Sequence, residues 1–168
     1  TILAESACDE DEDVAEVSIC YVGGVNTAGI FTGGGESIII EDGIVLATGD
    51  VRAAEGFNQT TASSGLSSGE GDDDLDYYFA VETRDSTSLE FTINVEEDAA
   101  GEVDFRFVFA SEEYNERVNL GYTDVFAIFV DGQNFAFVEG TELPVNANTV
   151  HGGNPFGGIG SNEQFYHN

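Results

Sequence analysis

Carboxylates with regular spacing are the residues of this sequence best suited to chemistry. Aspartates alternate from Asp72 to Asp76 directly after Gly71, and two adjacent glutamates end a stretch of alternating aromatic residues. Calcium binds several hard oxygen ligands contributed by such loops and strand ends. We therefore predict a structural calcium site that draws on Asp72, Asp74, Glu112, Glu113 and Asp124, with Asn119 as a further ligand.

Two plainer interpretations of these acidic residues stay open. Glu112 and Glu113 could cap loop amides or pair with Arg117, and residues 72–76 could form a solvated acidic face. The spacing is not that of an EF-hand, because the glycine and the terminal glutamate of that loop are not at the required positions.

The overall charge excludes one large class of partner. The chain has 33 acidic residues against 4 arginines, with no lysine, and its formal net charge is −29. A nucleic-acid-binding surface needs basic residues that neutralise phosphates, so we expect no nucleic-acid partner. The self-repulsion of so many carboxylates is relieved by salt or by divalent cations, which again favours calcium.

The two cysteines and one sequon bear on the compartment. Cys8 and Cys20 are predicted to form a disulfide, typical of an oxidising environment, although two buried free thiols remain an alternative. Asn58 begins an N-glycosylation sequon ahead of a Ser/Thr-rich stretch. No apolar run is long enough to span a membrane, so we expect a secreted or surface protein without direct membrane insertion.

Catalytic motifs are poorly represented, and we predict that the chain is not an enzyme. Both histidines, His151 and His167, lie in a Gly/Asn-rich C-terminal stretch, away from any nucleophile motif. The glycines at 33–35 have no following lysine, so they do not form a phosphate loop. The Glu112 and Glu113 pair is not singled out as a glycosidase pair among so many acids.

Period-two alternation is the dominant pattern that must position these residues. Residues 14–21 and 89–95 alternate apolar with polar side chains, and residues 103–109 repeat the pattern after a turn near Gly101. We predict that 89–95 and 103–109 pair as antiparallel strands with a buried aromatic face. Arg106, on the opposite face, is expected to pair with Glu90 across the strands.

Further hairpins complete the expected fold. Residues 38–40 and 44–46 are predicted to pair around a turn at 41–43, and Asp131-Gly132 turns the apolar stretch 125–130 into 135–138. Residues 50–71 are expected to form a long loop. We predict an all-β, antiparallel two-sheet β-sandwich of jelly-roll type with long Gly/Ser/Asp-rich loops, organised as a leader (1–21) and one sandwich domain (22–168).

Three ordered motifs carry a resemblance to a known family. They are the Gly-Asp-Asp-Asp-Leu-Asp segment at 71–76, the Phe-Arg-Phe-Val-Phe-Ala-Ser-Glu-Glu-Tyr segment at 105–114 and the Thr-Asp-Val-Phe segment at 123–126. Together with Asn119 and the stretch 140–148, they resemble the choice-of-anchor L domain family of prokaryotic surface proteins. The resemblance implies an extracellular β-sandwich module, and it implies no catalytic activity.

Members of this family usually continue past the segment that resembles residues 165–168 with a further pair of strands. Either the sequence continues past residue 168, or the missing edge is supplied in another way. An open sandwich edge attracts strands from other chains, and for the second case we expect the leader, residues 1–21, to serve as a donor strand for a neighbouring copy. The predicted function is a calcium-stabilised structural subunit of an extracellular prokaryotic fibre or surface assembly, and its main partner is further copies of the chain. The alternative is a calcium-dependent adhesin or carbohydrate-binding module that binds glycans through exposed aromatic residues such as Tyr77, Tyr78 and Tyr122.

Overall fold

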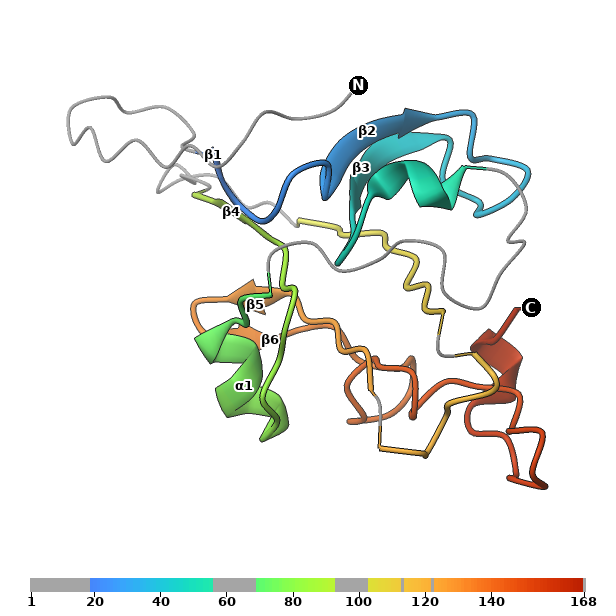
Figure 1. Ribbon diagram of the computed structural model, residues 1–168. Coiled ribbons are helices and arrows are strands. Elements are labelled where there is room, and N and C mark those ends of the chain that lie inside the picture. The colour runs from blue at the N-terminus through green and yellow to red at the C-terminus, as the bar shows by residue number, and fades with distance from the viewer. Residues whose placement is uncertain (1–18, 56–68, 93–102, 113, 122, 168) are drawn as a thin grey trace. The chain divides into compact units, whose positions relative to one another are not determined.

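The structure is a computed structural model that describes residues 19–55, 69–92, 103–112, 114–121 and 123–167. The chain divides into two compact units, which are described separately (Figure 1). The first unit comprises Thr1–Asp72 and Glu82–Phe107, and the second comprises Asp73–Val81 and Val108–Asn168. Both units are built from short antiparallel strands and few helices, which confirms the predicted all-β class. The two-sheet sandwich and the division at residues 21 and 22 stay predictions.

In the first unit, β1 (Ile19–Val22) pairs with β4 (Ser88–Phe91). The ladder is antiparallel, with Ile19 opposite Phe91 and Val22 opposite Ser88. Apolar residues alternate with polar ones along β4, and the Tyr21 side chain of β1 is 7% exposed. The Tyr21 hydroxyl donates to the carbonyl of Gly24 at 3.0 Å, which closes the turn after β1. The last residues of the predicted leader are therefore a strand of this unit.

The second hairpin of this unit differs from the one that the sequence predicted. β2 (Ala28–Thr32) pairs with β3 (Asp42–Leu46), with Ile30 opposite Ile44, whereas the predicted pairing of 38–40 with 44–46 is wrong. Residues 33–41 form the connection instead, since the Gly34 N–H donates to the Glu41 carbonyl at 3.0 Å. Gly33 has a φ of 78°, a left-handed conformation that glycine adopts without steric cost and that ends β2.

The predicted pairing of 89–95 with 103–109 is also wrong. β4 pairs with β1, residues 103–109 form no ladder, and residues 93–102 lie outside the described part of the chain. A ring contact joins the two stretches, with 6.1 Å between the ring centroids of Phe91 and Phe105. Both rings are about two-fifths exposed, so the predicted burial of this aromatic face is not observed. No salt bridge joins Arg106 to Glu90 among the described residues, since neither appears in the observed ion pairs.

In the second unit, three segments pair with one another to form a closed ring, which we call the three-segment ring (124–130, 133–138 and 143–147). β5 (Phe129–Val130) and β6 (Gln133–Asn134) form its hairpin, and the predicted turn at Asp131 and Gly132, both with positive φ, is confirmed. The remaining contacts are bridges between Phe137 and Pro144 and between Val125 and Asn146. Each segment therefore pairs with both others.

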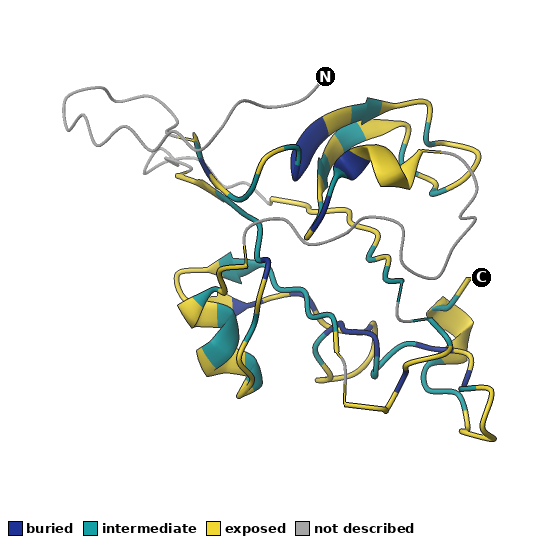
Figure 2. Ribbon diagram, viewed as in Figure 1, coloured by how far each residue is buried: buried dark blue, intermediate teal, exposed yellow. Residues whose placement is uncertain are grey.

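Most of the buried residues of the second unit lie on the segments of this ring (Figure 2). Exposure alternates along residues 134–138, where Asn134, Ala136 and Val138 are buried and the phenylalanines between them face outward. Asn134 is a buried polar residue within this pattern, and its Oδ1 accepts the backbone N–H groups of Ile128 at 3.1 Å and Ala136 at 2.9 Å. Because this oxygen accepts two hydrogen bonds, its burial costs little free energy.

The aspartates at 73–76 belong to a helix and not to a loop. α1 spans Asp73–Phe79, with three aspartates in its first turn, where the helix dipole favours negative charge. Tyr78 of α1 contacts Phe129 of β5 edge to face, with 5.8 Å between ring centroids. In the first unit, the short 3-10 helix η1 (Val51–Ala54) is capped by Asp50, and the 3-10 helix η2 (Glu163–Phe165) follows the ring in the second.

Candidate functional site

The candidate site is a set of polar side chains in the second unit that surround the segment 118–124. The sequence places asparagines at 119, 146, 148 and 154, which we call the asparagine cluster. Asparagine side chains bond readily to nearby backbone groups, so they hold turns that have no regular ladder. The side chains of Asn146, Asn148 and Asn154 each make at least one such bond, and Asn119 takes part through its backbone N–H.

Asn148 joins the two ends of residues 119–123. Its Oδ1 accepts the backbone N–H of Asn119 at 2.7 Å, and its Nδ2 donates to the Thr123 hydroxyl at 2.5 Å. Asn146, only 7% exposed, orients Asn148 in turn, because its Oδ1 accepts the Asn148 N–H at 2.8 Å. The side-chain amides of Asn146 and Asn148 therefore hold this loop, which belongs to the predicted calcium region.

Asp124 is anchored on both its side chain and its backbone. Its Oδ2 accepts the hydroxyl hydrogen of Ser111 at 2.5 Å, and its carbonyl accepts the Ala147 N–H at 3.1 Å. The Ser111 bond brings the segment that carries Glu112 to the start of the ring. Asp124 and Glu112 are both partly buried.

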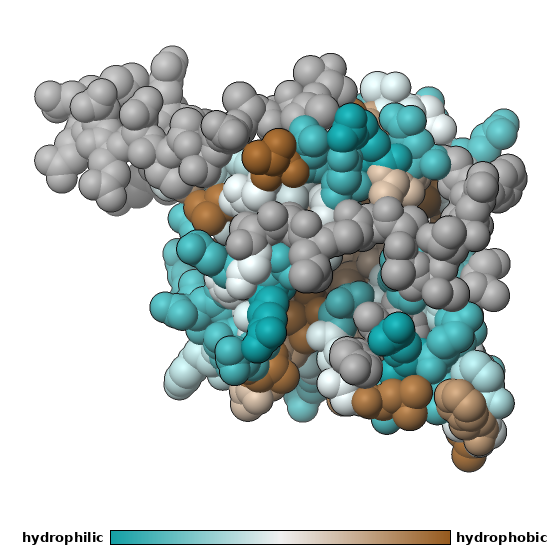
Figure 3. Space-filling view, viewed as in Figure 1, coloured by the Kyte–Doolittle hydropathy of each residue, from teal (hydrophilic) through white to brown (hydrophobic). Residues whose placement is uncertain are grey.

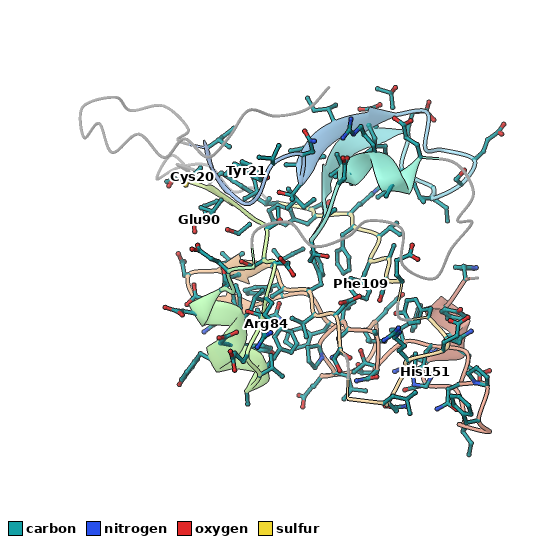
Figure 4. All side chains as sticks on the ribbon, in the orientation of Figure 1. Cys20, Tyr21, Arg84, Glu90, Phe109 and His151 are labelled. Carbon is teal, nitrogen blue, oxygen red and sulfur yellow. The ribbon has the colours of Figure 1, made fainter. Side chains whose placement is uncertain are left out.

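His151 is the most enclosed polar residue of this region, and its side chain is 1% exposed (Figure 4). Its Nδ1 accepts the backbone N–H of Gly153 at 3.0 Å, so the neutral ring carries its proton on Nε2. Nε2 lies 3.5 Å from the side-chain amide of Asn119. The Asn119 atom at this distance is the amide nitrogen, Nδ2.

The predicted calcium ligands are therefore only partly brought together. Asp124 and the segment of Glu112 are joined through Ser111, Asn119 faces His151, and Glu113 lies outside the described residues. Asp72 directly precedes α1 and Asp74 lies in its first turn. Within the described ranges, no group of three or more His, Cys, Asp or Glu side chains is arranged to hold a metal ion. The calcium site stays a prediction.

Two tyrosines next to the site have raised pKa values. Burial raises the pKa of Tyr114 to about 12, and the nearby Tyr166 and Asp124 add to this shift. Burial also raises the pKa of Tyr166. The two rings meet edge to face, with 5.1 Å between their centroids. Loss of water around the rings disfavours the charged phenolate, which explains the direction of both shifts.

The remaining predicted site residues are placed as follows. Cys20 lies on β1 opposite Glu90 and is not a free thiol, but Cys8 lies outside the described residues, so the disulfide stays a prediction. Asn58 also lies outside them. His151, Asn146 and Asn148 were missed as site residues by sequence reasoning. The available signal was the Asn-Ala-Asn-Thr stretch at 146–149, which is typical of side-chain-stabilised turns.

The comparison with protein families decides the classification. The family model of the choice-of-anchor L domain matches residues 1–168, the whole chain. The chain belongs to the choice-of-anchor L domain family. This confirms the resemblance carried by the motifs at 71–76, 105–114 and 123–126.

Membership of the choice-of-anchor L domain family indicates a surface-associated protein, at the cell surface or outside the cell. No curated protein and no solved structure matches the chain. In the part of the chain that the structure describes, no helix is long and apolar enough to cross a membrane. The family and the fold class thus agree with the predicted surface location.

Proposed function

We propose that this chain is a structural subunit of an extracellular prokaryotic fibre or surface assembly, that copies associate by strand exchange, and that calcium stabilises the assembly. The observation that carries the proposal is the β1–β4 ladder. β1, which contains the end of the leader, pairs with β4 alone and has no second neighbour among the described strands. The same four residue pairs would form if β1 came from another copy, so the ladder is a ready interface for exchange.

The exposure of these strands supports self-association. Ile19 is 64% exposed, Val22 46% and Phe91 42%. A two-stranded sheet is marginally stable alone, and its open edges accept further strands. Assembly would cover these side chains and would supply neighbours for both edges.

Charge supports the calcium part of the proposal. Subunits with a net charge of −29 repel one another, and divalent cations or salt relieve this repulsion. Among the predicted ligands, Asp124 is joined to the segment of Glu112 by the hydrogen bond from Ser111. Asp72, Asp74, Glu113 and Asn119 complete the proposed ligand set.

The chain acts without catalysis in this proposal, as a building unit. The buried histidine of the site uses Nδ1 to hold a loop, which is a structural role and leaves no free base on that atom. A second candidate function is a calcium-dependent adhesin or carbohydrate-binding module. It is favoured by Tyr77 of α1, whose ring is 91% exposed and could stack on a sugar.

The test is the particle mass by light scattering, before and after addition of a calcium chelator. We expect the wild-type chain to form a polymer that dissociates when calcium is removed. We expect a Leu89→Pro variant to assemble less, because proline removes a backbone donor from β4. A Leu89→Ala variant, which removes the same side chain but keeps the backbone donor of β4, is the matched control. A stable particle near the 17.9 kDa monomer in both conditions would exclude the fibre and favour the adhesin module.

A further inference from the structure

The loop between His151 and Ser161, here called the glycine loop (152–160), has a fixed base. The His151 N–H donates to the Ser161 carbonyl and the Ser161 N–H donates to the His151 carbonyl, both at 2.9 Å. Inside the loop, the Oδ1 of Asn154 accepts the N–H groups of Phe156 at 3.0 Å and Gly158 at 3.2 Å. These bonds order the loop before any partner arrives, which lowers the entropy cost of docking.

The glycine loop presents its apolar side chains to solvent. Phe156 is 80% exposed and Ile159 is 90% exposed. The loop projects from the ring of its own unit (Figure 1), and apolar atoms lie at its end on the visible face (Figure 3). Two large apolar side chains held outward on an ordered loop are typical of an interaction surface.

The distribution of charge limits what the loop can contact. Residues 143–162 contain no Asp, Glu, Lys or Arg, although the chain carries a net charge of −29. Residues 17–35 form another long stretch without these residues, and they include β1 and β2. Two copies of such an acidic chain approach with least repulsion where charge-free stretches face each other.

β2 and β3 offer an apolar face for this contact. Ile30 and Ile44 lie directly opposite each other, 49% and 53% exposed, and Leu46 on the same face is 39% exposed. Asp42 lies at the end of this face, opposite Thr32, and is the one carboxylate in the two strands. A cross-strand pair of branched aliphatic side chains is a flat surface that an apolar loop tip covers well.

We propose that the glycine loop docks on the β2–β3 face of a second copy of this chain. The contact is heterologous, since it joins two different surfaces, and a heterologous contact that does not close gives a filament. This inference rests on the proposed function, because it names a second contact between the same subunits. The contact is small, so it acts together with strand exchange, through the raised effective concentration of a tethered neighbour.

The experiment uses the absence of tryptophan from the sequence. A full-length Phe156→Trp reporter at low concentration is titrated with the tryptophan-free wild-type chain, and the emission spectrum is recorded. We expect the emission maximum to move to shorter wavelength as the indole leaves water. A Tyr77→Trp reporter, changed at a side chain of similar exposure on α1, keeps its spectrum.

The acceptor face is tested with two partner variants. An Ile44→Ser partner is expected to bind the Phe156→Trp reporter roughly tenfold more weakly, from the loss of one buried aliphatic side chain. An Ile39→Ser partner, changed at an 88% exposed isoleucine outside both strands, binds as wild type does. Equal shifts with the Ile44→Ser and wild-type partners would exclude the β2–β3 face.

The particle mass of the same samples separates this inference from the proposed function. A polymer that leaves the indole emission of the Phe156→Trp reporter unchanged would overturn the loop contact and keep the fibre. A spectral shift in a particle no larger than a dimer would keep the loop contact and exclude the fibre. A shift with phosphatidylcholine vesicles, and none with wild-type chain, would assign the loop to a lipid surface and overturn the proposal.

Discussion

The Nδ1 of His151 accepts the backbone N–H of Gly153 at 3.0 Å, and this bond connects the buried imidazole to the start of the glycine loop. The histidine is thus a structural acceptor, although histidine at a candidate site usually suggests catalysis or metal binding. Its backbone also pairs with Ser161. One residue therefore fixes both the base and the entry of the loop.

Replacement of His151 by alanine is expected to destabilise the protein by about 3 kcal/mol, since the variant leaves a cavity and an unpaired donor. The side chain is 1% exposed, and the Gly153 N–H loses its acceptor. The free energy of unfolding from urea titration measures the loss. His167→Ala, changed at an exposed histidine, is the control and should stay within about 0.5 kcal/mol of wild type. Equal losses in the two variants would contradict the structural role of His151.

Two glycines of the glycine loop have the same backbone conformation but different surroundings, so their alanine variants can be compared. Gly153 and Gly157 have φ values of 93° and 94°, so alanine is strained at either position. A Cβ at Gly153 would lie 2.6 Å from the Gly158 carbonyl oxygen, whereas a Cβ at Gly157 meets nothing within 4 Å. We expect Gly157→Ala to cost about 1 kcal/mol and Gly153→Ala clearly more. Thermal melting of both variants checks the order, and the reverse order would contradict the close packing at Gly153.

Removal of the Asn148 side chain should loosen residues 119–123. Asn148→Ala loses the acceptor for the Asn119 N–H and the donor to the Thr123 hydroxyl, and we expect a cost of about 1–2 kcal/mol. Asn148→Asp keeps the acceptor and should recover part of the loss. Hydrogen exchange of the Asn119 amide measures the local effect. Unchanged protection of this amide in Asn148→Ala would contradict the proposed bond.

Alkaline pH should weaken the fold through Tyr114. Its pKa is raised from 10.0 to about 12, so the folded state keeps a proton that the unfolded chain loses near pH 10. The stabilising contribution is complete below pH 10 and is lost as the pH rises through 12. Unfolding free energies measured across this range should fall less steeply for Tyr114→Phe than for wild type. Tyr77→Phe, changed at an exposed ring, serves as the control.

The calcium proposal makes a separate prediction at Asp124. Calcium should raise the melting temperature of wild type, because a ligand that binds only the folded state stabilises it. Asp124→Asn removes one charge from the proposed ligand set and should reduce the effect, whereas Asp131→Asn, in the exposed β5–β6 turn, should not. Calorimetric titration without heat from calcium in the wild type would refute the calcium site.

Short-range signals in the sequence identified the local elements better than their partners. The Asp131-Gly132 turn is encoded by residues that adopt positive φ, so its hairpin was predictable. Alternation correctly marked Leu89 and Phe91 as strand residues, but alternation is the same for any partner, and β4 pairs with β1 and not with 103–109. Register across a long loop depends on tertiary packing, which local patterns do not encode.

In the candidate site too, the contributions of local sequence were predictable and those of tertiary packing were not. Asp124 and Glu112 were predicted together as calcium ligands, and Asp124 accepts a hydrogen bond from Ser111, the residue before Glu112, although the calcium site itself stays a prediction. The role of His151 was not predictable, because it depends on burial and on the conformation of Gly153. The helix at 73–79 was missed because Asp-Tyr-Tyr-Phe has no strong helical propensity, and it is favoured by acidic residues at its N-terminus.

The closed ring of the second unit has a consequence for the order of folding. All its pairings join residues that are close in sequence, whereas the ladder between Ile19 and Phe91 joins residues far apart. Chains with low contact order fold quickly, and long-range pairing is slower because the intervening loop must close first. The ring should therefore fold quickly once residues 124–147 have been made, whereas the β1–β4 ladder forms slowly although both of its strands are made earlier. During that interval, newly made chains at high local concentration compete for one another's β4 strands, so assembly would be under kinetic control.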